Sequence, residues 1–91
     1  MKRYALVTGH RTMQISTAFT MAHTQTLFGK SLRKWRTKRG LSQEELADRA
    51  SMHPTYLARI ERGSQNVCLA NIGKLARALR IPIAKLFRGV S

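Results

Sequence analysis

The chain has 91 residues, of which 43% are hydrophobic, and this suffices for one small domain with a modest core. Its net charge of +13 attracts polyanions, with nucleic acid the first candidate and an anionic membrane surface or an acidic protein the alternatives. A single cysteine excludes an internal disulfide framework, and the lack of an apolar run of about 18 residues argues against a membrane span.

Residues Met1 to Thr26 form a leader whose composition differs from that of the remaining chain. It is rich in Thr and Ser and carries basic residues but no acidic one. We expect this leader to be a disordered tail. The alternatives are a basic arm that lies on DNA or exchanges into a partner subunit, and a natural translation start at Met21. Alternating apolar residues from Met13 to Met21 also allow a strand.

The first predicted helix runs from Phe28 to Arg39. Phe28, Leu32 and Trp35 recur at helical spacing and mark its inward face, while basic residues cover its other sides. Gly40 follows as a glycine that ends the helix. Such a charged face is usually only solvated, but next to a DNA-binding motif a few of these cations are expected to contact phosphates.

The second predicted helix runs from Gln43 to Ala50. Small or aliphatic residues share its inward face: Leu46, Ala47 and Ala50. Ser42 stands at the N-cap position, and Glu45 follows three residues later, which is the pattern of a capping box. The start of this helix is therefore encoded locally.

The third predicted helix runs from Pro54 to Arg62, with Leu57 and Ile60 facing inward. Proline suits the first turn of a helix because its missing N–H would have no partner there. Between the second and third helices lie Ser51, Met52 and His53. This length is typical of a helix-turn-helix, whose second helix enters the DNA major groove.

Two further helices complete the expected core. The fourth runs from Leu69 to Leu79, and its inward residues are Leu69, Ile72, Leu75, Ala76 and Leu79. The fifth runs from Pro82 to Phe87 and is expected to bury Ile83, Leu86 and Phe87. Five helices around one core make an all-α fold.

The run from Leu41 to Gly63, LSQEELADRASMHPTYLARIERG, resembles the Cro and phage-repressor (Xre) helix-turn-helix family. Arg36 and the later Leu-Ala-Arg-Ala-Leu segment match that family as well. The resemblance covers roughly residues 27–87. It implies a five-helix, lambda-repressor-like DNA-binding domain over residues 27–91, after the leader of residues 1–26. Ser51 departs from the family, which usually has glycine there, at a cost on the order of 1 kcal/mol in a left-handed turn.

Four residues of the third helix are expected to meet the bases: Pro54, Thr55, Tyr56 and Arg59. Arg59 can donate two hydrogen bonds to O6 and N7 of a guanine, and its alternatives are a phosphate contact or a solvated side chain. Thr55 lies near the helix N-terminus, where base edges are usually met, although it also suits a helix start. Tyr56 can donate its hydroxyl to a phosphate, or its ring can lie over the turn. Pro54 can contribute only its shape and apolar contact.

Six residues are expected to contact DNA phosphates: Gln43, His53, Arg62, Ser64, Asn66 and Lys38. Gln43 can donate its amide to an oxygen that the free N–H groups of its helix also face. Its alternative is a merely polar first-turn residue. His53 can also cap the third helix.

Arg36 and Glu61 have a different expected role. The resemblance implies that they form an ion pair between the first helix and the end of the third, the alternative being two independent surface charges. Removing one partner of such a half-buried pair strands a charge, at a cost of roughly 3–5 kcal/mol.

Catalytic signals are weak. The three histidines and Cys68 show no zinc-finger spacing, no H-E-x-x-H and no C-x-x-C, and there is no glycine-rich phosphate loop. We interpret Cys68 as a small buried hydrophobic residue. No enzymatic activity, metal, cofactor or small-molecule effector is expected.

These patterns predict a sequence-specific regulator of transcription that binds double-stranded DNA in the cytoplasm of a bacterium or phage. We expect a repressor or autoregulator that reads the major groove with its third helix. It would act as a homodimer on a pseudo-palindromic operator that overlaps a promoter. The alternatives are a restriction–modification controller, the antitoxin of a toxin–antitoxin pair, a protein-interaction module that has lost DNA reading, and a basic peptide on a membrane surface.

Overall fold

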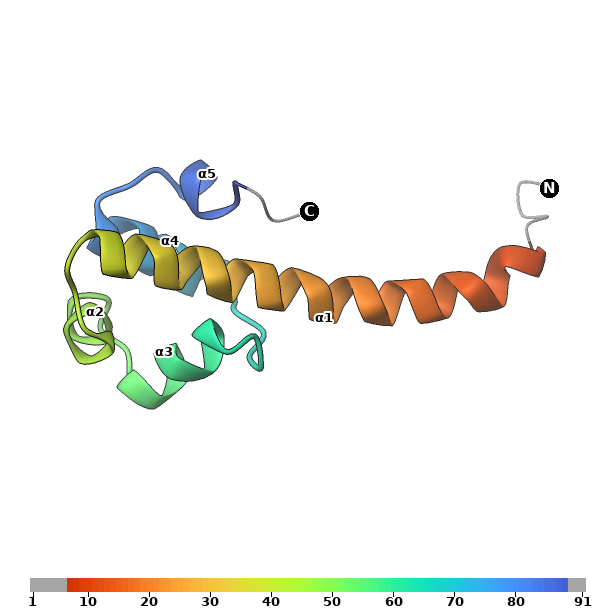
Figure 1. Cartoon of the computed structure of the whole chain (residues 1–91), viewed down its shortest axis with the longest axis horizontal. Helices are drawn as coiled ribbons and strands as arrows, with labels where there is room; N and C mark the ends of the chain where they lie inside the picture. The colour runs from red at the N-terminus through yellow and green to blue at the C-terminus, as the bar shows by residue number, and fades with distance from the viewer. Residues whose placement is uncertain (1–6, 89–91) are drawn as a thin grey trace.

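The computed structural model describes the backbone of residues 7–88 and the side chains of residues 23–88. Within this part of the chain there are five helices and no strand: α1 (Val7–Lys38), α2 (Gln43–Arg49), α3 (Pro54–Glu61), α4 (Leu69–Leu79) and α5 (Ile83–Leu86). The C-terminal part of α1 lies between α3 and α5, and α4 packs against α2 and α5 (Figure 1). The predicted all-α fold is confirmed.

Helix α1 extends much further toward the N-terminus than the predicted start at Phe28. Its helical backbone begins at Val7, and its N-terminal half projects away from the bundle (Figure 1). The strand considered from Met13 to Met21 is therefore wrong. No proline interrupts this stretch, and a helix that packing has already nucleated gains one hydrogen bond for each residue that it adds. The division into a leader and a domain stays a prediction.

The core lies where the four short helices meet the C-terminal part of α1. Its largest fully buried side chains are Leu32, Leu46, Leu57, Ile60, Leu75, Leu79 and Leu86. Each belongs to a face that helical spacing marks as inward. No helix of the described chain is both long enough and apolar enough to cross a membrane.

Three large apolar residues that we predicted to be buried are exposed instead. Leu69 is 75% exposed at the first position of α4, where no other helix covers it. Ile83 and Phe87 are 43% and 38% exposed, because α5 is a single short turn that can bury only one side. Phe87 still meets Phe28, with their ring centroids 5.4 Å apart.

The turn between α2 and α3 is a tight one. Ser51 has a φ angle of 55°, which is the left-handed conformation that glycine adopts without strain. The backbone N–H of Met52 donates to the carbonyl of Ala47 at 2.9 Å, so the chain reverses within a few residues. Ser51 thus occupies a left-handed position.

Replacing this residue gives a first test. We expect Ser51→Gly to raise the free energy of unfolding by on the order of 1 kcal/mol, because glycine relieves the left-handed strain. Urea unfolding monitored by circular dichroism measures the change. Ser51→Ala keeps the β-carbon and should bring no such gain, so equal stabilisation by alanine would show that strain is not the cause.

Helix α2 begins with the predicted capping box. The hydroxyl of Ser42 accepts a hydrogen bond from the backbone N–H of Glu45 at 3.0 Å, and the Glu45 carboxylate accepts one from the Ser42 N–H at 2.8 Å. The bond from the Ser42 N–H lowers the pKa of Glu45 below its ordinary value. The two bonds therefore satisfy two backbone N–H groups at the start of α2 and fix the point where this helix begins.

Candidate nucleic-acid interface

Helix α3 starts at a defined point. Pro54 is its first residue, and the imidazole Nδ1 of His53 accepts a hydrogen bond from the backbone N–H of Thr55 at 3.1 Å. His53 is thus the N-cap of α3, one of the two roles considered for it. The cap leaves the exposed His53 side chain beside the first turn, where base edges are usually met.

Thr55 and Arg59 project from the outer face of α3. Both side chains are exposed, whereas Leu57 and Ile60 on the inner face are 0% and 1% exposed. Residues four apart in a helix lie on the same side, so Thr55 and Arg59 form one strip along the surface. An exposed strip of this kind on a rigid helix can enter a groove without unfolding anything.

Tyr56 is half-buried, and its ring packs against the hydrophobic core. Its hydroxyl accepts a hydrogen bond from the Asn71 side-chain amide of α4 at 3.0 Å. This contact ties α3 to α4, and the expected role of Tyr56 at the DNA stays a prediction. A tyrosine hydroxyl that accepts one hydrogen bond still carries a proton that it can donate to a phosphate.

Arg36 and Glu61 form a two-pronged ion pair between α1 and the end of α3. Arg36 Nε lies 2.6 Å from Glu61 Oε2, and Arg36 Nη2 lies 3.0 Å from Glu61 Oε1. A third hydrogen bond runs from Arg36 Nη1 to the carbonyl of Leu41 at 2.8 Å. The two side chains are only 12% and 3% exposed, and the contact holds the pKa of Arg36 above its ordinary value. The pair fixes α3 against α1.

Gln43 joins this pair, which sequence reasoning did not foresee. Its amide nitrogen donates to Glu61 Oε1 at 2.9 Å. The Glu61 carboxylate therefore binds both Arg36 and the first residue of α2. Spacing along the chain contains no signal for a contact between residues so far apart. The second N–H of this amide remains for a phosphate, and that role stays a prediction.

The remaining candidates for phosphate contacts are scattered. Ser64 donates its hydroxyl to the carbonyl of Arg59 at 3.2 Å and so helps to close the end of α3. Arg62 and Asn66 are exposed beside that end. Lys38 lies elsewhere, with its ammonium group 4.9 Å from the ring centre of Trp35, on the face of α1 that meets α5. The structure therefore does not bring Lys38 together with α3.

Gly29 is a structural residue behind this site that the sequence analysis missed. A β-carbon at this position of α1 would lie 2.7 Å from the carbonyl oxygen of Glu61 and would also collide with that of Ile60. Only glycine lets α1 and the last turn of α3 approach so closely. No signal marked it in the sequence analysis, because the predicted helix begins at Phe28 and places Gly29 in its first turn. Only the longer α1 makes it a mid-helix glycine, which otherwise weakens a helix.

The described side chains contain no cluster of three His, Cys, Asp or Glu that could hold a metal ion. Cys68 is exposed, so our interpretation of it as a buried residue is wrong. It precedes α4 at the N-cap, on the same uncovered end as Leu69.

Helix α3 follows a short turn, is held by the ion pair of Arg36 with Glu61 and exposes a polar strip. These features define a helix-turn-helix protein that binds DNA and regulates transcription. The chain belongs to the Helix-turn-helix family HTH_3, whose model matches residues 32–86. This confirms the resemblance that the segment from Leu41 to Gly63 carries.

Several known proteins are similar to this chain. Control protein C.BamHI from Bacillus amyloliquefaciens is 46% identical over 56 residues, which cover 60% of this chain and 69% of that protein. Control protein C.MunI from a Mycoplasma species is 39% identical over 64 residues, 69% of this chain and 86% of that protein. The crystal structure of the restriction-modification controller protein C.AhdI from Aeromonas hydrophila is 48% identical. It covers 69% of this chain and 96% of its own, with a TM-score of 0.69.

Proposed function

We propose that this protein is the transcriptional controller of a restriction–modification pair, acting as a repressor or autoregulator at an operator that overlaps a promoter. The similarity to C.AhdI carries this proposal, because it reaches 48% identity and spans 96% of that controller. The relatives C.BamHI and C.MunI, which are also named as control proteins, support it. We further infer that the chain has no catalytic activity and works in the bacterial cytoplasm, where its DNA lies.

In the proposed complex, α3 enters the major groove. Its exposed strip presents the guanidinium of Arg59 to a guanine edge and the methyl group of Thr55 to a thymine methyl. The N-terminus of α2 faces a phosphate, to which the second amide N–H of Gln43 donates. The ion pair of Arg36 with Glu61 fixes the position of α3 relative to the N-terminus of α2.

We propose that the protein binds as a homodimer, because one recognition helix reads only a few base pairs. The exposed apolar side chains on α4 and α5 support a contact between copies there: Leu69, Ile83 and Phe87. Light scattering after size-exclusion chromatography, with and without DNA, tests the dimer. A monomer under both conditions would contradict it.

Selection of binding sites from random duplexes tests the proposed function most directly. The expected product is a pseudo-palindrome whose half-site centres are about one helical turn apart. Preference for this duplex should persist as salt rises, since base contacts do not depend on counterion release. If affinity for all duplexes fell equally as salt rose, the protein would bind DNA only through its charge, and the proposal would fail.

Arg59 provides the sharpest mutational test of base reading. We expect Arg59→Ala to weaken binding to the selected duplex by roughly 1–3 kcal/mol and to relax specificity at one base position. Fluorescence anisotropy with duplexes that vary one base at a time measures both effects. The matched control is Arg62→Ala, which should weaken all duplexes equally if Arg62 contacts a phosphate. An equal loss on random DNA for Arg59→Ala would show that Arg59 is a phosphate contact too.

A further inference from the structure

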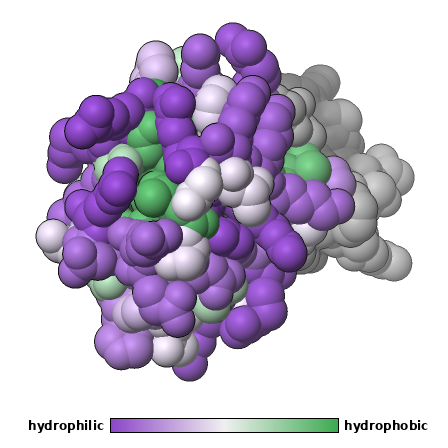
Figure 2. Space-filling view, turned by 60° about the vertical axis from the view of Figure 1, so that its left-hand side comes forward, coloured by the Kyte–Doolittle hydropathy of each residue, from purple (hydrophilic) through white to green (hydrophobic). Residues whose placement is uncertain are grey.

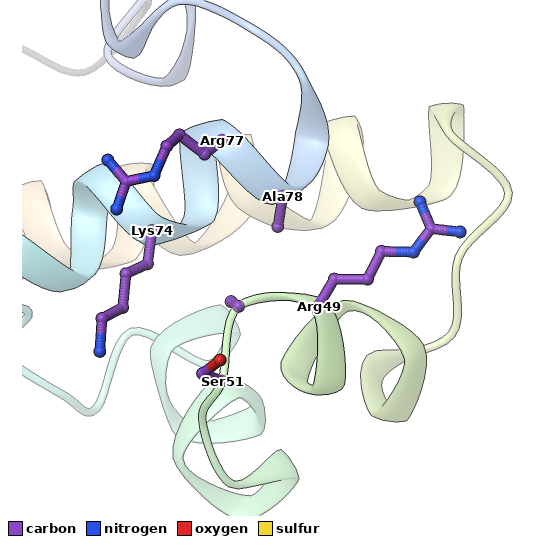
Figure 3. A pocket seen from close by; sticks show the side chains of 6 residues that line it. Arg49, Ser51, Lys74, Arg77 and Ala78 are labelled. Atoms are coloured by element: carbon purple, nitrogen blue, oxygen red, sulfur yellow. The ribbon is translucent and has the colours of Figure 1, made fainter.

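A groove lined by cations lies between α2 and α4. One part, of about 310 Å³, is lined by Arg49, Ala50, Ser51, Lys74, Arg77 and Ala78 (Figure 3). The neighbouring part, of about 420 Å³, is lined by Arg39, Leu41, Arg49, Ala78, Leu79 and Arg80. Arg49 and Ala78 line both parts, so the two are continuous.

The positive charge of this groove is largely uncompensated. None of the residues that line it is acidic, and five of them are Arg or Lys. Arg49 interacts electrostatically with Glu45, which is itself held by the capping box. Arg39 donates to the carbonyls of Leu79 and Arg80 at 2.8 and 3.3 Å, and these bonds hold its side chain in place in the groove. Like charges along a concave surface concentrate the positive potential there and attract an anion.

The groove lies beside the helix-turn-helix, because one of its lining residues, Ser51, stands three residues before Pro54 at the start of α3. Its cations belong to α2, to α4 and to the residues that follow α1 and α4, and none belongs to α3. The end of the molecule that carries α2 is covered mostly by hydrophilic side chains, with a small hydrophobic area among them (Figure 2). The groove is therefore a different surface from the strip of Thr55 and Arg59 on α3.

We propose that the groove between α2 and α4 binds the phosphate backbone of a second DNA segment while α3 reads the operator. Arginine presents a planar fork that matches two phosphate oxygens, and four of the five cations are arginines. The groove is shallow and open, which suits a continuous strand, whereas a small-molecule site encloses most of its ligand. This inference rests on the proposed function, because it gives the regulator a means of linking two DNA segments.

A capture assay with the full chain tests the proposal. The selected duplex is immobilised and saturated with protein, and a second, fluorescent duplex of unrelated sequence is then added. We expect wild-type protein to capture the second duplex. The triple variant Arg49→Gln, Lys74→Gln, Arg77→Gln should bind the immobilised duplex with its preference intact but capture at least about tenfold less of the second. The salt slope of that capture should become shallower by about 2–3, since each lost phosphate contact removes about 0.9.

The matched control removes one lysine and two arginines outside the groove, as Lys30→Gln, Arg33→Gln, Arg88→Gln. This variant carries the same net charge as the groove variant and should still capture the second duplex. Equal losses in the two variants would overturn the proposal, because net charge alone would then explain capture. Thermal unfolding of both variants checks that neither has lost its fold.

Two further outcomes are informative. Wild-type protein that binds poly-glutamate through the groove but captures no second duplex would overturn the proposal in favour of an acidic protein partner. A protein that lacks preference for any immobilised duplex would instead refute the proposed function, which the selection experiment detects separately. At protein concentrations that still saturate the immobilised duplex, Arg59→Ala should relax specificity at one base position and still capture the unrelated duplex, so the two surfaces can be told apart.

Discussion

Glu61→Ala is expected to lower the free energy of unfolding by about 3–5 kcal/mol, because it strands the half-buried guanidinium of Arg36. The Glu61 carboxylate accepts hydrogen bonds from Arg36 Nε, Arg36 Nη2 and the amide of Gln43, so a single substitution removes all of them. For a domain of this size, whose total stability is on the order of 5–15 kcal/mol, such a loss is large. Urea unfolding at neutral pH measures it.

Two controls separate the ion pair from the loss of an acid as such. Glu44→Ala removes an exposed carboxylate from the first turn of α2 and should cost much less. The double variant Arg36→Met, Glu61→Leu removes both charges and should recover most of the stability, since a well-packed apolar pair often replaces a buried ion pair at little cost. Unchanged stability of Glu61→Ala would show that the pair contributes nothing to the fold.

The same substitution is expected to weaken DNA binding. Glu61 neither points to the outer strip of α3 nor carries a charge that would attract DNA, so its effect must pass through the positions of α3 and of Gln43. Measured at a temperature where the variant remains folded, affinity for the selected duplex should fall. Full affinity in a folded Glu61→Ala protein would show that α3 keeps its position without the pair.

Gly29→Ala is the second change with a large expected effect. The new β-carbon would lie 2.7 and 2.9 Å from the carbonyl oxygen and carbon of Glu61, and backbone atoms cannot move aside as a flexible side chain can. Overpacking of this kind typically costs about 1–3 kcal/mol and sometimes more. Because it would push the end of α3 away from α1, it should also lengthen the contact between Arg36 and Glu61. Thermal unfolding reports the loss of stability.

Gly73→Ala is the matched control within the same fold. Gly73 also lies inside a helix, α4, but its added β-carbon would meet only the side chain of Arg77, at 3.7 Å. Alanine at such a site is expected to stabilise the helix by about 0.5–1 kcal/mol. The two glycine substitutions should therefore have opposite signs. Destabilisation of similar size at both would show that the close approach at Gly29 is not the cause.

Local signals in the sequence were sufficient for most of the helix limits. Helix α4 was predicted over the range that it occupies, and α2 and α3 were predicted to within one residue at their C-terminal ends. The capping box at Ser42 and the proline at the start of α3 act within one turn of the chain, so they can be recognised without tertiary information. The left-handed residue at Ser51 was not found in this way, because only the resemblance to a family that usually has glycine there indicated it.

Other features depend on helices that are distant in the sequence, and only the folded chain decided them. Helical spacing identifies the inward face of a helix, but it cannot say whether a neighbour covers the end of that face, and Leu69 is exposed for this reason. The close contact at Gly29, the bond from Gln43 to Glu61 and the cationic groove between α2 and α4 all join residues from different helices. Periodicity along one helix contains no information about these distances, because the packing of the helices against one another sets them.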